Sequence, residues 1–296
     1  RQRCRSMNWS SEENELVSRL RLFQQVDVFT SAPFLGNPVA VVLDGEGLST
    51  EEMQRFARWT NLSETTFVVP PTVPGAQYRL RIFTTTRELP FAGHPTLGSC
   101  HAWLSTDGAG HAGEMVVQEC GAGLVRIRRS EGRLGFAAPP LVRTGPLEDE
   151  LLARICRLAG ISPHLIVDAQ WVDNGPGWAA VLLPSADQVL SLPAPDLAGI
   201  ALGVVGPYEP GSPCAFEVRA FYPDVQGTFE DPVTGSLNAS LAQWMIAAGL
   251  APSTYVVSQG TVLGREGRVH IERDIDDATV WVSGDTVTAI AGRVTI

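Results

Sequence analysis

One short pattern occurs twice in this chain and restricts its possible folds more than any other feature. Residues 88–94 (ELPFAGH) and 230–236 (EDPVTGS) share Glu, Pro and Gly, and each matched pair is separated by 142 positions. The strand-like segments just before them, RIF from Arg81 and RAF from Arg219, match at a separation of 138. Because 296 residues are also enough for two domains, the repeat predicts two similar domains related by an approximate twofold axis.

Each copy of the repeat predicts a strand, a turn at Pro and Gly, and then a helix that is apolar on most sides. Backbone N–H groups in the first turn of a helix lack intrahelical partners and carry the positive end of the helix dipole. Two such helix starts, at Gly93 and Gly235, would form an anion site in a cleft between the domains. The expected ligand is a small carboxylated molecule. Under the alternative reading, both glycines only cap helices and the similarity is a remnant of duplication.

The side chains around the repeat are candidates for the chemistry, because they differ between its copies. The first copy has His94 where the second has Ser236, and the second has Asp231 where the first has Leu89. A single His is more often structural than catalytic, and an Asp before Pro often only forms a turn. Neither residue type alone therefore decides the function.

Glu64 is a third candidate, at the point where a loop enters the apolar segment TTFVV. Burial beside Phe67 would raise the pKa of its carboxyl group toward the range that is useful for proton transfer at neutral pH. A surface or capping Glu is the alternative interpretation of this position.

Composition excludes several other classes of protein. The net charge is -10 and Lys and Arg are not clustered, which disfavours a nucleic-acid surface. Five cysteines without a C-x-x-C pair fit neither a disulfide framework nor a zinc site, and the five histidines lack metal-ligand spacing. The sequence has no P-loop or dinucleotide fingerprint, no signal peptide pattern and no run of 18 apolar residues. We therefore expect a cytoplasmic protein that binds neither nucleic acid nor membrane.

The boundary between the two predicted domains lies near Pro139. A Pro-rich segment there introduces an amphipathic helix with Leu147, Leu151, Ile155 and Leu158 aligned. This assigns residues 1–138 to an N-terminal domain and residues 139–284 to a C-terminal domain. In the first domain, Ser49 and Glu52 form the pattern of a capping box ahead of another amphipathic helix.

Four motifs occur in order along the chain: FTSAPFLGNPVAVV, NLSETTFVV, RIFTTTRELPFAGHPTLGS and FEDPVTGSLNASLAQWM. Together they resemble the motifs of the PhzF (phenazine biosynthesis) family, in the diaminopimelate epimerase-like superfamily, and the similarity extends from about Gln25 to Leu250. The resemblance implies an α+β fold of two similar domains, each a mostly antiparallel sheet, or open barrel, wrapped around a central helix. It also implies that the final strand, at about 285–296, returns to the first domain.

The same resemblance implies a cofactor-free isomerase that acts in the interdomain cleft, usually as a homodimer. The carboxylate of the motif that matches Glu64 is the principal acid and base of the family, with His94 and Asp231 as the other catalytic candidates. The substrate-binding candidates are Gly93, Gly235 and Ser236. The phenazine-pathway member of the family isomerises trans-2,3-dihydro-3-hydroxyanthranilate, a cyclic amino acid with a carboxylate.

In this interpretation Glu64 removes a proton from one activated carbon and returns a proton to another. His94 and Asp231 hold the amine or hydroxyl group, and the helix starts hold the carboxylate.

Differences between this sequence and the motifs of related enzymes restrict the mechanisms that we expect. The family often has Pro where Thr85 stands, which affects only the rigidity of a loop. Racemases of the superfamily carry thiols at the two turns, where this chain has His94 and Asp231, so a thiol mechanism is disfavoured. A Ser/His/Asp hydrolase is also disfavoured, because the G-x-S-x-G pattern is absent. The main alternative is a non-catalytic small-molecule-binding or interaction protein on the same fold, although a binder would not need Glu64.

Overall fold

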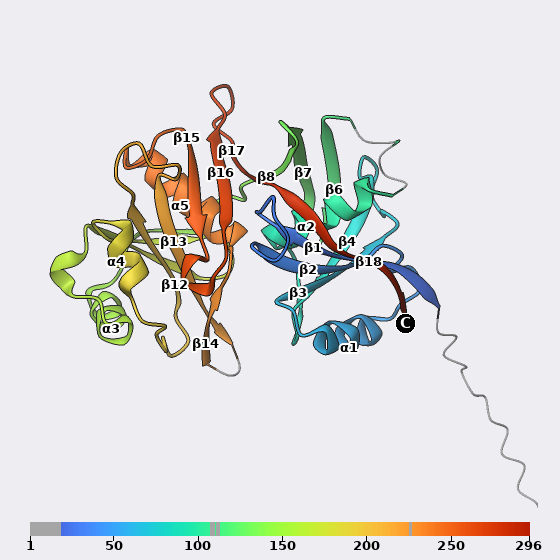
Figure 1. Cartoon of the computed structure of the whole chain (residues 1–296), viewed down its shortest axis with the longest axis horizontal. Coiled ribbons are helices and arrows are strands. Elements are labelled where there is room, and N and C mark those ends of the chain that lie inside the picture. Colours follow the sequence, from blue (N-terminus) through green and yellow to red (C-terminus); the bar gives the residue numbers. More distant parts are fainter. Residues whose placement is uncertain (1–18, 107–109, 111–112, 225–226) are drawn as a thin grey trace, which may run out of the picture.

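The computed structural model describes residues 19–106, 110, 113–224 and 227–296. Residues 1–18, 107–109 and 111–112 of the predicted first domain lie outside the described residues, as do residues 225–226 of the second. Two groups of strands lie side by side, and each contains one largely buried helix, α2 (Gly93–Leu104) or α5 (Gly235–Ala247) (Figure 1). The burial of both helices confirms the prediction that protein surrounds each of them.

The first group is built around α2, which contacts most of its strands. Its sheet is antiparallel except where β2 pairs with β3 and β4 pairs with β6. The strands of this group are β1 (Leu20–Val28), β2 (Asn37–Val42), β3 (Glu64–Val69), β4 (Tyr78–Phe83), β5 (Glu88–Leu89), β6 (Met115–Cys120), β7 (Gly123–Ser130) and β8 (Arg133–Ala137).

The second group repeats this order around α5. Its parallel pairs are β11 with β12 and β13 with β15, at the places that correspond to β2 with β3 and β4 with β6. The strands are β9 (Arg143–Pro146), β10 (Asp168–Asp173), β11 (Trp178–Leu182), β12 (Ala201–Pro207), β13 (Phe216–Asp224), β14 (Gly227–Asp231), β15 (Thr254–Gln259), β16 (Gly267–Arg273) and β17 (Val280–Gly284).

The remaining elements cover the sheets or connect strands. In both groups a helix joins the first parallel pair, α1 (Thr50–Thr60) between β2 and β3 and α4 (Ala186–Ser191) between β11 and β12. Helix α3 (Asp149–Ala159) and two short 3-10 turns, η2 (Pro163–Leu165) and η3 (Thr261–Leu263), belong to the second group. The predicted capping box of α1 is confirmed, because Ser49 and Glu52 exchange hydrogen bonds of 2.8 and 3.2 Å.

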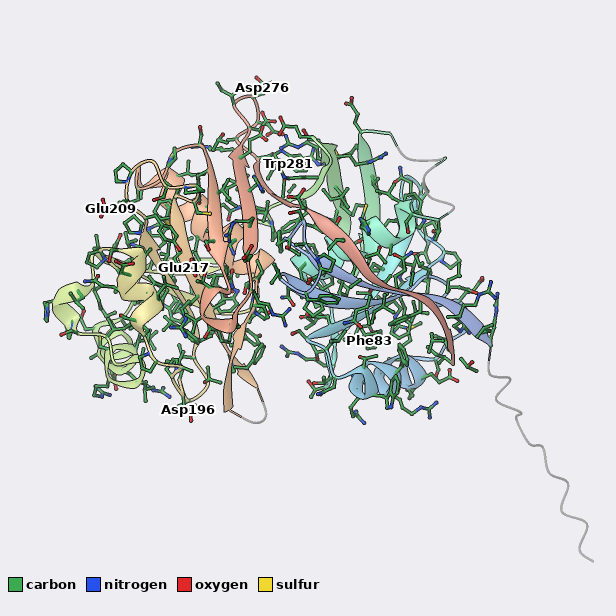
Figure 2. The ribbon with its side chains drawn as sticks, viewed as in Figure 1. Phe83, Asp196, Glu209, Glu217, Asp276 and Trp281 are labelled. Carbon is green, nitrogen blue, oxygen red and sulfur yellow. The ribbon has the colours of Figure 1, made fainter. Side chains whose placement is uncertain are left out.

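Two strand pairs connect the groups. The last strand, β18 (Thr286–Thr295), pairs with β1 and crosses the first group in Figure 1, and β17 pairs with β8. Trp281 of β17 lies at this junction (Figure 2) and is stacked under the guanidinium groups of Arg126 and Arg128. One hydrophobic cluster also includes residues from both groups, such as Leu97 and Leu237. The division into residues 1–138 and 139–284 stays a prediction.

Candidate active site

The Arg and Glu residues that the two copies share form a repeated ion pair. In the first group, the guanidinium group of Arg81 in β4 binds both oxygens of Glu88 in β5, at 2.8 and 2.7 Å. In the second group, Arg219 in β13 binds both oxygens of Glu230 in β14, at 2.8 and 2.6 Å. The two glutamates of the repeat therefore tie a short strand to its neighbour.

The two turns bring the helix starts into contact. A Cβ atom added to Gly235 would lie 3.0 Å from the Cα atom of Gly93, and one added to Gly93 would lie 3.1 Å from the Cα atom of Gly235. Among the residues that the structure describes, no side chain caps either helix at its N-terminus. The first N–H groups of both helices, which lack intrahelical acceptors, thus begin at one place in the molecule.

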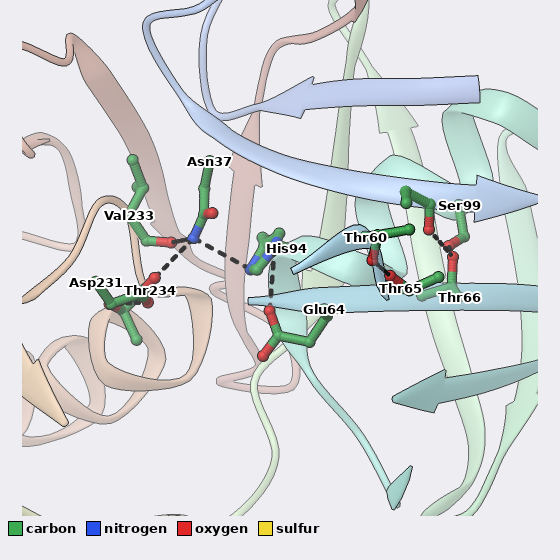
Figure 3. Close-up of polar contacts among 11 residues, drawn as sticks. Asn37, Thr60, Glu64, Thr65, Thr66, His94, Ser99, Asp231, Val233 and Thr234 are labelled. Atoms are coloured by element: carbon green, nitrogen blue, oxygen red, sulfur yellow. Dashed lines mark hydrogen bonds and ion pairs between the residues drawn. The ribbon is translucent and has the colours of Figure 1, made fainter. Parts of the chain in front are cut away.

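Three of the candidate residues gather beside these helix starts. His94 is the second residue of α2, Glu64 is the first residue of β3, and Asp231 is the last residue of β14. Nε2 of His94 lies 3.4 Å from Oε2 of Glu64, as Figure 3 shows. Asn37, the first residue of β2, connects His94 with Asp231: its Nδ2 atom donates to Oδ1 of Asp231 (2.9 Å) and lies 3.3 Å from Nδ1 of His94.

The facing atoms of Glu64 and His94 are buried without hydrogen-bond partners among the described residues. The side chains are 15% and 6% exposed, and neither Oε2 of Glu64 nor Nε2 of His94 has a partner. Most buried polar atoms in proteins are paired, so an exception asks for a functional explanation. Two such atoms that face each other can bind or exchange protons with a polar ligand.

Burial also determines the charges at this site. It raises the pKa of Glu64 to about 8, with a smaller contribution from the negative charge of Asp231. It raises the pKa of Asp231 to about 6, against hydrogen bonds from Thr234 and Asn37, and lowers the pKa of His94 to about 3. Near neutral pH, His94 is therefore uncharged, Asp231 is mainly ionised, and Glu64 holds a proton that it releases readily.

A network behind Asp231 holds the start of α5. The hydroxyl group of Thr234 donates to Oδ2 of Asp231 at 2.5 Å, and Nε2 of Gln259 donates to the Asp231 carbonyl at 3.1 Å. The amide oxygen of Gln259 accepts from the Thr234 N–H group and from Nδ2 of Asn238, at 3.0 and 2.8 Å. This network takes the place of a side-chain cap and gives Asp231 a defined orientation.

Ser236 follows Gly235 in α5, but other residues bind it. Its hydroxyl group accepts a hydrogen bond from Nε1 of Trp178 at 3.1 Å, and its carbonyl group accepts one from Nδ2 of Asn174 at 2.9 Å. Among the described residues, no recorded contact joins Ser236 to Glu64, His94 or Asp231. The structure thus brings together the three catalytic candidates and the two glycines, and it places Ser236 beside them on the same helix start.

Sequence reasoning missed Asn37 as a member of this site. The available signal was an Asn directly before Pro at the head of the strand segment PVAVV, since a buried side-chain amide has to find hydrogen-bond partners. Its partners come from positions 94, 231 and 233.

The grouping of side chains and the length of the helices bear on metal binding and membrane insertion. Within residues 19–106, 110, 113–224 and 227–296, no three His, Cys, Asp or Glu side chains are grouped so that they could hold a metal ion. None of the helices in that part of the chain is both long and apolar enough to cross a membrane.

Comparisons with known proteins agree with this architecture. The family described as Phenazine biosynthesis-like protein (PhzC-PhzF) matches residues 26–292. A protein of Schizosaccharomyces pombe, Antisense-enhancing sequence 1, is 35% identical over 92% of this chain and 97% of its own. The trans-2,3-dihydro-3-hydroxyanthranilate isomerase of Pseudomonas aeruginosa is 32% identical over 90% of this chain and 97% of its own.

Solved structures show the same fold. The crystal structure of a PhzF-family phenazine biosynthesis protein from Enterococcus faecalis matches with a TM-score of 0.76 and 25% identity, over 94% of this chain and all of that chain. The α+β fold class and the resemblance that the motifs predicted are confirmed.

Proposed function

This chain belongs to the PhzC-PhzF family of phenazine biosynthesis-like proteins and is an isomerase of that family, and we propose that it moves a proton within a small carboxylated substrate without a cofactor. The observation that carries this proposal is the pair of buried atoms, Oε2 of Glu64 and Nε2 of His94, which face each other at 3.4 Å and have no hydrogen-bond partner among the described residues. An acid/base catalyst needs a carboxyl group that is within reach of the ligand and titrates near neutral pH.

In the proposed reaction, the ionised carboxylate of Glu64 removes a proton from a carbon atom next to an unsaturated system of the substrate. The C–H bond breaks as an O–H bond forms on Glu64, and the electron pair moves through the conjugated system to another carbon. Glu64 then returns the proton to that second carbon, which regenerates the carboxylate. The pKa of about 8 makes both protonation states of Glu64 accessible near physiological pH.

His94 and Asp231 are proposed to bind the amine or hydroxyl group of the substrate. Asp231 supports this role because it is ionised near neutral pH and is oriented by Thr234 and Asn37. The carboxylate of the substrate is proposed to bind at the adjoining helix starts, at Gly93, Gly235 and Ser236, where free backbone N–H groups favour an anion. Assembly as a homodimer, a cytoplasmic location, and the lack of nucleic-acid and membrane partners are further proposals.

The test uses trans-2,3-dihydro-3-hydroxyanthranilate, the substrate class named for the Pseudomonas relative. Native protein, Glu64→Gln and the matched control Glu88→Gln are incubated with the compound in D2O, and ultraviolet absorbance and deuterium incorporation by NMR are followed. We expect exchange with native protein and with the control, because Glu88 only pairs with Arg81. We expect at least a roughly 10²-fold loss in Glu64→Gln, with binding retained.

The other outcomes separate the alternatives. Binding by native protein without exchange would favour a non-catalytic binding protein on the same fold. That alternative is worth testing because the Schizosaccharomyces pombe relative is not named as an isomerase. Neither binding nor exchange would mean that this substrate class is wrong.

A further inference from the structure

Asn37 is a fully buried side chain whose amide nitrogen contacts groups from both halves of the molecule. Nδ2 donates to Oδ1 of Asp231 and to the carbonyl oxygen of Val233, each at 2.9 Å, and lies 3.3 Å from Nδ1 of His94 (Figure 3). An amide nitrogen carries two hydrogens and no lone pair that accepts. The two oxygens at 2.9 Å engage its hydrogens, so Nδ1 of His94 faces a group that can only donate.

The orientation of this amide is determined by its neighbours. If the amide were rotated by half a turn, Oδ1 would lie against the carboxylate of Asp231 and the carbonyl group of Val233, and oxygen would face oxygen twice. Only the orientation with Nδ2 toward both acceptors satisfies them. Asn37 therefore presents a fixed donor to the imidazole ring.

The loop before Asn37 is held by the second half of the chain. Nη1 of Arg265 donates to the carbonyl groups of Phe34 and Gly36, at 3.0 and 3.2 Å. Phe34 has a φ angle of 74°, which is costly for a bulky residue and persists only where the surroundings enforce it. A Cβ atom on Gly36 would lie 2.2 Å from the Val28 carbonyl oxygen. The backbone thus leaves Asn37 little freedom to move away from His94.

We propose that Asn37 is a positioning residue that keeps Nδ1 of His94 unprotonated, so that the proton of the neutral ring lies on Nε2 and is directed at Glu64. The position of the ring proton is inferred from the contacts alone, and only its role in catalysis rests on the proposed function. A hydrogen on Nδ1 would lie against the amide nitrogen of Asn37, which is 3.3 Å away and cannot accept it, whereas a lone pair on Nδ1 is attracted by the positive end of the amide dipole. A ring N–H at Nε2 then faces Oε2 of Glu64 at 3.4 Å and favours the ionised carboxylate that removes a proton.

Other groups around the His94 ring also affect where it carries a proton. The backbone carbonyl of Pro38 attracts a proton on the ring and raises the pKa of His94 against the larger effect of burial. Asp231 carries its charge on the other side of Asn37, and its second oxygen accepts from Thr234. Glu64 faces Nε2. Without Asn37, a protonated Glu64 that donates to Nε2 would favour the tautomer with the proton on Nδ1.

The first experiment needs neither substrate nor variant of Asn37. Native protein labelled with ¹⁵N in its histidine rings is studied by NMR at neutral pH, and the His94 signals are assigned by their loss in His94→Gln. We expect the spectrum of a neutral ring with the proton on Nε2. A proton on Nδ1 in the native protein would overturn the proposal, whether or not the protein acts on the test compound.

The second experiment compares Asn37→Ala and Asn37→Ser with the matched control Ser99→Ala. Ser99 lies on the same helix as His94 and does not touch the ring (Figure 3). Its replacement by Ala removes a buried hydrogen bond of 2.8 Å to Thr66. We expect Asn37→Ala to move the ring proton to Nδ1 and to lower kcat by about 10²-fold, with KM changed by less than about twofold. Asn37→Ser, which keeps a donor, should recover part of the loss.

The pH profile of the exchange reaction separates positioning from a general loss of structure. In Asn37→Ala the rising limb of kcat should move to higher pH, because ionised Glu64 loses its N–H donor, whereas Ser99→Ala should keep the native profile. A folded Asn37→Ala that retains the native tautomer and profile would overturn the proposal. If the Asn37 variants do not fold, the spectrum of the native protein decides. Absence of exchange in native protein would count against the proposed function alone.

Discussion

Gly93 and Gly235 begin two different helices and touch each other, so closely that a Cβ atom on Gly235 would lie 3.0 Å from the Cα atom of Gly93. The Cα atoms of both glycines belong to the backbone, so they cannot rotate away from an added Cβ atom as a flexible side chain can. The proposed anion site depends on this contact, which brings two helix dipoles to one point.

The contact predicts a steric cost for any side chain at the second glycine. Gly235→Ala should lower the free energy of unfolding by about 1–3 kcal/mol, because the helix starts have to separate. It should also weaken binding of a carboxylated ligand. Urea unfolding and ligand titration measure both effects. The control is Gly292→Ala in β18, where an added Cβ atom meets nothing within 4 Å and should change stability by less than about 0.5 kcal/mol. Equal effects of the two substitutions would contradict the prediction.

The ion pair of the repeat is buried in one copy and more exposed in the other, so the stability that each pair contributes can be compared. Arg219 and Glu230 have side chains that are 1% and 6% exposed, whereas Arg81 and Glu88 are 18% and 38% exposed. Arg219→Ala leaves a buried carboxylate without its partner and should cost about 3–5 kcal/mol. Arg81→Ala should cost less than about 1 kcal/mol. Chemical denaturation of the two variants measures the difference, and similar losses would refute this account of the repeat.

The raised pKa of Glu64 predicts how stability depends on pH. The unfolded chain releases this proton near its ordinary pKa of 4.5, whereas the folded protein retains it up to about 8. Ionisation of Glu64 should therefore contribute a loss of stability as pH rises between these values, by at most about 1.4 kcal/mol for each pH unit. Glu64→Gln cannot ionise, so its stability relative to wild type should increase across this window and stay constant below it. Denaturant unfolding of wild type and Glu64→Gln at several pH values tests this, and a stability difference between them that does not change with pH would contradict it.

The raised pKa of Glu64 also predicts how catalysis depends on pH. If ionised Glu64 is the base, kcat/KM for proton exchange should rise with pH from about 6 to about 9, following the ionisation of Asp231 and then of Glu64. Thr234→Val removes a hydrogen bond that lowers the pKa of Asp231, so the lower limb of its profile should move to higher pH. A rate that is constant or falls over this range in native protein would exclude Glu64 as the base.

Periodicity and spacing predicted the elements that local sequence controls. The capping box of Ser49 and Glu52 starts α1 as predicted, because its atoms lie within one helical turn. The two apolar helices lie inside their sheets, since a helix without a polar face has to be covered. The repeat separation of 142 corresponds to two groups of strands with the same order and the same parallel pairs. The roles of the site residues stay predictions.

The sequence by itself determined the fold class, the duplication and the family, because strands, buried helices and ordered motifs are written in local patterns. Only the tertiary structure showed that Glu64 faces His94, whereas Glu88 and Glu230 pair with arginines. It alone revealed that Asn37 connects His94 with Asp231. The physical reason is that the pKa and the partners of a side chain depend on the atoms around it. Here those atoms come from positions that are up to 196 residues apart in the chain.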